Sequence, residues 1–466
     1  MQVFPIRLVM LLAAVACPLV AQTARNSAGN PGQEKGAAQA LPGAPRIAVA
    51  PFEMLRRDPR YDWLGEGLAE LAIEELAADA GENAGLAAQV IPREEWLAAL
   101  ERMGLPAGAR FSRATLLKIG NELDADSILV GRYATDGKAL SISARLLHIH
   151  PAQLSAEVSQ SGAFEDVLEV EARVSWQIRS LVVPEMAVRA CCQAPGRGRA
   201  PSRVDSFEAY ARGMAAADEA VRIRLLREAA RLDPQWDLPA FALGKSYLAR
   251  RDCTNAVLWF EKLRGDDPWR AAEAAFDAGV CWLQRDEPAR ARHSLAATNN
   301  VTPAELWNNL GVAHLRLGEW QEAAAATEES IRLEPDSPAA WFNLGLAAFW
   351  ADGAAIPAPR RDSGARAFRE ALRQKPEDLE IRAWLVAALE RTGRTAEAEA
   401  LREDAPGRLP VIPAGAGVPA ARKQKGRAGA TLPEPPPYAR IGRLQASLEA
   451  GWRTRERRGN GGEAAP

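Results

Sequence analysis

The chain has 466 residues, which is enough for two or three domains. Hydrophobic residues make up 47% of it and charged residues 25%, an ordinary soluble balance. The formal net charge is −2, so no global charge attracts nucleic acid or an acidic membrane, and we expect no nucleic-acid partner.

The first 21 residues have the pattern of a secretory signal peptide. Arg7 precedes the apolar run 8–16, and small residues follow up to Ala21. The run is shorter than the roughly 20 residues that a membrane-spanning helix needs. We therefore expect a periplasmic or otherwise exported protein, with residues 22–44, rich in Gly, Ala, Gln, Asn and Pro, as a flexible spacer.

Cleavage has two interpretations. Cys17 follows Ala14-Val15-Ala16, which is a weak form of a bacterial lipoprotein box because the usual leucine is missing. Lipidation of Cys17 would make the protein an outer-membrane lipoprotein. Cleavage after Ala21 is the simpler alternative.

Residues 45–190 are expected to form an α/β domain with a mixed sheet. Strands and helices alternate first, and Asp136-Gly137 then predicts a hairpin between two strands. Helices are expected at 63–80, 93–103, 112–123 and 164–182, and strands at 46–52, 89–91, 127–133, 140–149 and 153–161. This order predicts one sheet that helices cover on at least one face.

Two stretches of this domain resemble TolB-like amino-terminal domains. In the first, a strand ends in Pro-Phe and a Trp-Leu-x-x-Gly-Leu helix follows; in the second, four small residues and the segment "ISARL" occur in order. The matching residues are Pro51, Phe52, Trp63, Leu64, Gly67 and Leu68, then Gly120, Ala125, Gly131 and Gly137. The resemblance implies an envelope-assembly module without catalytic residues.

After a linker at 191–202, residues 203–402 repeat with a period of about 34 residues. Gly244, Gly279, Gly311 and Gly345 are spaced 35, 32 and 34 apart. A small alanine follows each of the first three glycines by twelve residues, and a proline follows twelve further on: Ala256, Ala291 and Ala323, then Pro268, Pro303 and Pro335. Such a period predicts stacked helix pairs that cannot bury their apolar faces alone.

The pattern resembles the tetratricopeptide repeat, W-x-x-L-G followed by A-x-x-x-F and P. Its best matches are Trp307, Leu310, Gly311, Ala323 and Pro335, then Trp341, Leu344, Gly345, Phe368 and Pro376. Ala240 and Ala275 replace the opening tryptophan, and Leu295 and Thr327 replace the later aromatic residue. We count five to six units. The predicted fold is α+β and multidomain: an α/β domain followed by an all-α tetratricopeptide solenoid.

The resemblance implies a concave groove lined by the first helix of each unit, which would bind a protein or peptide. Three positions per unit are expected to face it, four and three residues apart and so on one helical face. They are Phe241, Lys245, Leu248, Phe276, Val280, Leu283, Asn308, Val312, Leu315, Phe342, Leu346 and Phe349. This set is mostly apolar and favours a partner with an apolar segment. The alternative is that several of these side chains pack between neighbouring repeats.

Four cysteines follow the signal peptide region, and none forms a Cys-x-x-Cys motif that would indicate a zinc or redox site. Cys191 and Cys192 are adjacent, which disfavours a bridge between them. Cys253 and Cys281 are interpreted as two small buried residues, and a bridge between neighbouring repeats is the alternative.

No catalytic or cofactor motif emerges. His148 and His150 lie two apart on one strand without a third metal ligand, and no nucleophile motif is present. Residues 403–466 are expected to be a disordered tail rich in Pro and Gly, and positions 422–458 hold ten Arg or Lys against three Glu. This tail, or a lipidated Cys17, would contact the envelope.

These features predict a non-enzymatic periplasmic adaptor that binds a protein or peptide in the groove of its repeat array. The alternative is a structural subunit of an outer-membrane assembly or secretion system that oligomerises through the TolB-like domain.

Overall fold

The computed structural model describes residues 45–77, 89–106, 108–182, 201–265, 267–298, 303–351, 363–412 and 440. The predicted signal peptide, the spacer, Cys17, Cys191 and Cys192 lie outside these residues, as do most of the linker and of the tail. No helix in the described part of the chain is long and apolar enough to cross a membrane.

The first part of the described chain contains a mixed sheet, as predicted. Its strands are β1 (Arg46–Val49), β2 (Glu53–Met54), β3 (Gln89–Val90), β4 (Ser127–Thr135), β5 (Ala139–His148), β6 (Gln153–Leu154) and β7 (Val158–Ala163). The order is β3-β1-β4-β5-β6, with β2 beside β4 and β7 beside β5. Strands β3, β1, β2 and β4 pair in parallel, whereas the pairs formed by β5 are antiparallel.

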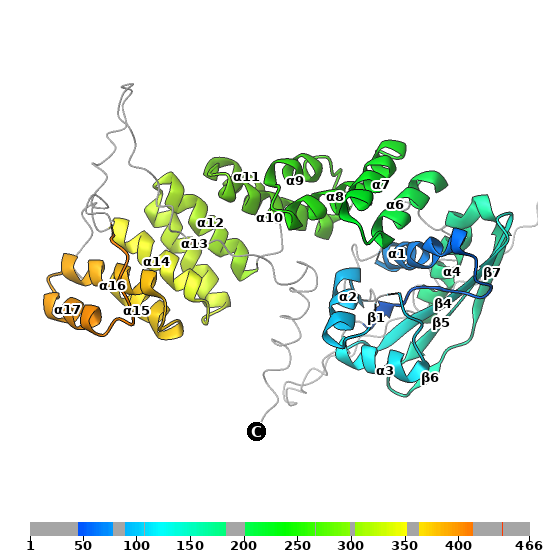
Figure 1. Ribbon diagram of the computed structural model, residues 1–466, viewed down its shortest axis with the longest axis horizontal. Helices are drawn as coiled ribbons and strands as arrows, with labels where there is room; N and C mark the ends of the chain where they lie inside the picture. Colours follow the sequence, from blue (N-terminus) through cyan, green and yellow to red (C-terminus); the bar gives the residue numbers. More distant parts are fainter. Residues whose placement is uncertain are drawn as a thin grey trace, which may run out of the picture. The chain divides into compact units, whose positions relative to one another are not determined.

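Helices cover both faces of the sheet (Figure 1). They are α1 (Trp63–Ala77) and α4 (Val167–Val182) on one face and α2 (Arg93–Arg102) and α3 (Arg113–Glu122) on the other, with short 3-10 turns at Pro59–Tyr61 and Phe164–Asp166. Successive residues of β1 point to opposite sides: Ile47 and Val49 join the core under α1 and α4, and Ala48 joins the core under α2 and α3. This alternation explains why β1 is apolar throughout.

Two local predictions in this domain are confirmed. Ser112 caps α3 by accepting a hydrogen bond from the Thr115 N–H at 3.2 Å. The turn between β4 and β5 has Gly137 at φ 91°, and the Asp136 carboxylate accepts N–H bonds from Lys138 and Ala139, both at 2.8 Å. The predicted long helix at 164–182 is shorter, because its first three residues form a 3-10 turn.

The repeat array consists of consecutive helices that pair along the chain (Figure 1). They are α6 (Val204–Ala215), α7 (Glu219–Leu232), α8 (Asp237–Ala249), α9 (Cys253–Phe260), α10 (Pro268–Gln284), α11 (Pro288–Ala296), α12 (Ala304–Leu317), α13 (Trp320–Leu333), α14 (Pro338–Ala351), α15 (Ser363–Gln374), α16 (Leu379–Arg391) and α17 (Thr395–Glu403). The described residues thus contain six helix pairs, from α6–α7 to α16–α17.

The repeating glycines lie where the two helices of a pair cross. A Cβ on Gly345 would approach the Phe368 ring to 2.5 Å, and one on Gly311 would lie 2.5 Å from the Thr327 methyl. Glycine allows this approach because it has no side chain. The position opposite the glycine, on the second helix of the pair, is therefore occupied by phenylalanine in one unit and by threonine in another.

Phe368 is fully buried and cannot yield to an added methyl group, so Gly345→Ala should cost about 1–3 kcal/mol in packing. Alanine ordinarily contributes ~1 kcal/mol over glycine inside a helix, so we expect a net destabilisation of the array of up to about 2 kcal/mol. Guanidinium unfolding followed by far-UV circular dichroism measures the effect. The double variant Gly345→Ala/Phe368→Leu, which takes the leucine found at Leu295 in another unit, should recover part of the loss. If Gly345→Ala alone were as stable as the parent, the close contact of Gly345 with Phe368 at the helix crossing would be contradicted.

The first repeat helix packs directly on the α/β domain. A Cβ on Gly67 of α1 would lie 2.7 Å from the Phe207 ring of α6, and the rings of Trp63 and Phe207 meet edge to face at 5.6 Å. Arg270 of α10 forms a buried ion pair with Glu74 of α1 at 2.5 Å. The predicted linker ends in contact with the array, because both the N–H and the hydroxyl of Ser202 donate to the Asp233 carboxylate.

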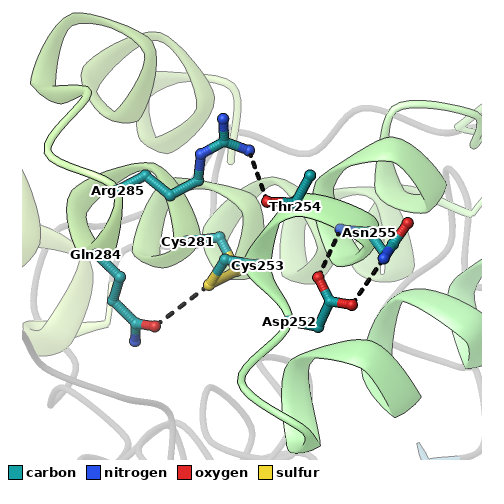
Figure 2. Close-up of a disulfide and its surroundings, with 7 residues drawn as sticks. All are labelled: Asp252, Cys253, Thr254, Asn255, Cys281, Gln284 and Arg285. Carbon is teal, nitrogen blue, oxygen red and sulfur yellow. Dashed lines mark hydrogen bonds between the residues drawn. A yellow bond between two sulfur atoms is a disulfide. The ribbon is translucent and has the colours of Figure 1, made fainter.

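A disulfide joins Cys253 of α9 to Cys281 of α10 (Figure 2). Their Cα atoms are 5.0 Å apart, and the two side chains are 7% and 0% exposed. The interpretation of these cysteines as two separate buried residues is therefore wrong, although their burial is correct. The bridge connects two neighbouring helix pairs, in agreement with the alternative prediction of a disulfide between neighbouring repeats.

Candidate functional site

Most of the twelve predicted groove residues are covered in the structure. Phe241, Lys245 and Leu248 are partly exposed, and the other nine are buried. Phe276, for example, lies in a small core with Leu295 of its own unit and Leu306 of the next one. The prediction of an open apolar groove is therefore wrong for the seven of them that pack within the stack, whereas the buried Asn308 and Phe342 contact Arg440 of the same chain.

Lys245 occupies its predicted face but is already paired. Its ammonium group contacts Glu273 at 2.8 Å and Asp277 at 3.0 Å, both on α10. Burial raises the pKa of Asp277 to about 6, in spite of the favourable charge of Lys245. This cluster links α8 to α10. Because two carboxylates pair with its charge, the lysine can lie on a mostly buried helix face.

A set of residues that includes Asn308 and Phe342 contacts Arg440 of the same chain. The Arg440 N–H donates to Asn343 Oδ1 at 2.8 Å, and the Arg440 carbonyl accepts from Asn343 Nδ2 at 2.8 Å. Asn308 Nδ2 donates to the same carbonyl at 2.8 Å. Asn343 Nδ2 also donates to Asn308 Oδ1 at 2.8 Å, so the two amides hold each other in place. Together they bind the main chain of one residue.

The side chain of Arg440 is bound as specifically as its main chain. Its guanidinium contacts both carboxylate oxygens of Asp378, at 2.9 and 3.1 Å, and Glu380 at 3.2 Å. The guanidinium carbon lies 4.4 Å from the centre of the Phe342 ring. A planar cation held by a carboxylate fork and an aromatic face is an arrangement that favours arginine over lysine.

Helix geometry places these groups together. Asn308 lies on α12, Phe342 and Asn343 lie on α14, and the carboxylates begin α16, so the first helices of three successive units contribute. Asp378 is the N-cap of α16 and accepts N–H bonds from Glu380 and Ile381 at 3.2 and 3.1 Å.

The cap and the cation together set the charge of the Asp378 carboxylate. Its partial burial alone would raise the pKa, but the hydrogen bond from Arg440 and the capping N–H groups lower it overall. The carboxylate is therefore ionised at neutral pH and available to a guanidinium.

Two of the twelve predicted residues, Asn308 and Phe342, belong to this site, whereas Asn343, Asp378, Glu380 and Arg440 were missed. The sequence carried one usable signal: the adjacent Asn308 and Asn309 are followed one repeat later by Asn343, and all three are buried. Buried amides require hydrogen-bond partners. Arg440 lies 97 residues after Asn343 in the sequence, so no local sequence pattern predicts the contact between them.

The α/β domain contains a cavity of about 720 Å³ beside β2, β4 and β5. Some polar side chains of its lining are paired within the domain: the Tyr133 hydroxyl donates to the Tyr61 carbonyl at 2.9 Å, and Arg145 pairs with Glu157 at 2.8 Å. His148, which the sequence analysis considered as a metal ligand, lies 2.9 Å from the Ser127 hydroxyl through Nδ1. The described residues hold no group of three or more His, Cys, Asp or Glu side chains arranged for a metal ion.

Comparison with known proteins identifies the repeats. Family profiles described as tetratricopeptide repeat match residues 304–337 and 360–410. A search of curated proteins found no match to this chain.

Solved structures similar to part of this chain include MamA and YrrB. The crystal structure of MamA is 22% identical, covers 36% of this chain and 88% of its own, and has a TM-score of 0.32. YrrB, described as a TPR protein with an unusual peptide-binding site, is 14% identical, covers 38% of this chain and 89% of its own, and has a TM-score of 0.33. MamA from Desulfovibrio magneticus RS-1 is 17% identical, covers 40% of this chain and 93% of its own, and has a TM-score of 0.30.

Proposed function

Since the helical array contains tetratricopeptide repeats, we propose that this protein is a non-enzymatic scaffold that holds a segment of a partner protein on the array. The observation that supports this most directly is the pair Asn308 and Asn343, which binds the N–H and the carbonyl of a residue far away in the sequence. Amide side chains that both donate and accept are suited to hold the main chain of an extended peptide.

The chemistry of this site revises the expected partner. The apolar side chains that were expected to bind it are mostly buried in the stack, whereas the carboxylates of the site, on Asp378 and Glu380, are partly exposed. A partner segment is therefore expected to be extended and to present an arginine, rather than to be an apolar helix. The α/β domain, with its resemblance to TolB-like domains, would connect this array to a second component of the envelope.

Export to an oxidising compartment is part of this proposal. Its support is the signal-peptide pattern of the first 21 residues together with the disulfide between Cys253 and Cys281, since such bridges persist mainly outside the cytosol. Mass spectrometry of the mature protein would identify its first residue and any lipid on Cys17. A mature protein that begins at Met1 would contradict export.

We expect the Arg440→Ala chain, which lacks the arginine seen in the site, to select arginine-containing peptides from a random peptide library, and the further change Asn343→Ala to lose at least tenfold in their recovery. The substitution removes two hydrogen bonds to the bound main chain, each of which typically contributes about 1 kcal/mol. Sequencing of the selected peptides measures the preference, and thermal melting shows that the variant is folded. A matched control is Asn255→Ala on α9, which removes an amide from another helix of the array. Equal recovery by Arg440→Ala and by Arg440→Ala/Asn343→Ala would refute the function.

A further inference from the structure

We propose that Arg440 is an internal ligand: it occupies the peptide site of its own chain, and a partner must displace it to bind. This inference rests on the proposed function and adds its regulation. It is based on the contacts that residue 440 makes with α12, α14 and the start of α16.

The main-chain contacts identify the occupant as a peptide rather than as a part of the repeat fold. One amide, that of Asn343, satisfies both the N–H and the carbonyl of Arg440, as a neighbouring β-strand would. Such contacts do not depend on the side chain of the bound residue. Any extended segment can make them, so the bond between the array and its tail is exchangeable.

The side-chain contacts make arginine the preferred residue. The guanidinium of Arg440 is shared between Asp378 and Glu380 and lies over Phe342, and the side chain remains 20% exposed. A lysine would keep the charge but lose the planar fork and the stacking. Because the group is only partly buried, a partner arginine can replace it without unfolding the repeats.

Charge and chain length support binding within one chain. The site has two carboxylates, and positions 422–458 of the sequence hold ten Arg or Lys against three Glu. Ile412, which is described at the end of the array, and Arg440 are 28 positions apart. An extended chain of that length reaches about 90 Å, which is ample for a return to α14. A tethered ligand competes at an effective concentration that dilution does not lower.

Fluorescence anisotropy with a labelled peptide of residues 436–444 tests this inference on the full chain. We expect Arg440→Ala to bind the peptide at least tenfold more tightly than the parent, since its own tail competes less well. Arg427→Ala, which removes the same charge from the same tail, should bind as the parent does. A peptide with alanine at the position of Arg440 should bind at least tenfold more weakly to the Arg440→Ala chain.

Each outcome has a distinct meaning. Equal binding by the parent and by Arg440→Ala would overturn the internal ligand but leave the peptide site intact. Absence of binding to both chains would overturn the proposed function as well. A dimer of the parent that light scattering shows to dissociate in Arg440→Ala would mean that a second copy supplies the arginine, which also overturns the inference. Tighter binding by monomeric Arg440→Ala would support it.

Discussion

Reduction of the bridge between Cys253 and Cys281 is expected to destabilise the repeat array by roughly 3–4 kcal/mol. The two cysteines are separated by 28 residues, and closing a loop of that size removes this much conformational entropy from the unfolded chain. Guanidinium unfolding with and without a thiol reductant measures the difference, with far-UV circular dichroism reporting on the helices.

The controls separate the bridge from the packing around it. Cys253→Ala/Cys281→Ala should be as unstable as the reduced parent, or slightly more so because it leaves small cavities, and should not respond to reductant. Replacing Cys191 and Cys192 with serine in all the proteins prevents exchange between thiols. A parent whose stability does not change on reduction, or whose unreduced form has free thiols at both positions, would show that the bridge does not form in solution.

The architecture was predictable because its determinants are local and repeated. Glycine lies at the helix crossings that contain Gly244, Gly279, Gly311 and Gly345. Prolines mark the boundaries between units, because Pro268 begins α10, Pro303 precedes α12 and Pro335 follows α13, so the period appears in the sequence. The mixed sheet was predictable for a similar reason: the hairpin at Asp136-Gly137 and the apolar run of β1 are short-range signals.

The site was less predictable because its contacts are long-range. The spacing that places Phe342, Leu346 and Phe349 on one helical face is correct, but spacing alone does not show that neighbouring units cover that face. Asn308 lies 132 residues from Arg440, so no window of sequence joins them. The resemblance identified the helices that line the site, whereas the charged groups at the start of α16 could be found only from the structure.

A second large effect is expected from Glu171 on α4, which is buried in the α/β domain. Its side chain is 1% exposed and accepts a hydrogen bond from the Ser175 hydroxyl, and no ion pair in the described part of the chain involves it. Burial raises the pKa of Glu171 from 4.5 to about 8, with a smaller contribution from Glu75. The folded protein therefore holds a proton there at neutral pH.

The raised pKa fixes the direction of the pH dependence. Below about pH 4.5 the carboxyl group is protonated in both the folded and the unfolded chain, and its full contribution to stability is present. As the pH rises towards 8, only the unfolded chain ionises, so the free energy of unfolding falls by about 1.4 kcal/mol per pH unit. Glu70 on α1, whose pKa burial also raises to about 8, adds a similar slope.

We expect Glu171→Gln to halve this slope between pH 6 and pH 8, so that the variant is more stable than the parent at pH 8 by a few kcal/mol and similar to it at pH 4.5. Glutamine keeps the shape of the protonated acid and does not ionise. Chemical unfolding of the α/β domain at several pH values measures the slope. Glu169→Gln, which changes an exposed residue of the same helix, is the matched control and should follow the parent. Parallel curves for the parent and Glu171→Gln would mean that Glu171 is ionised in the folded protein, and the packing of α4 against the sheet would then require a cation or water beside it.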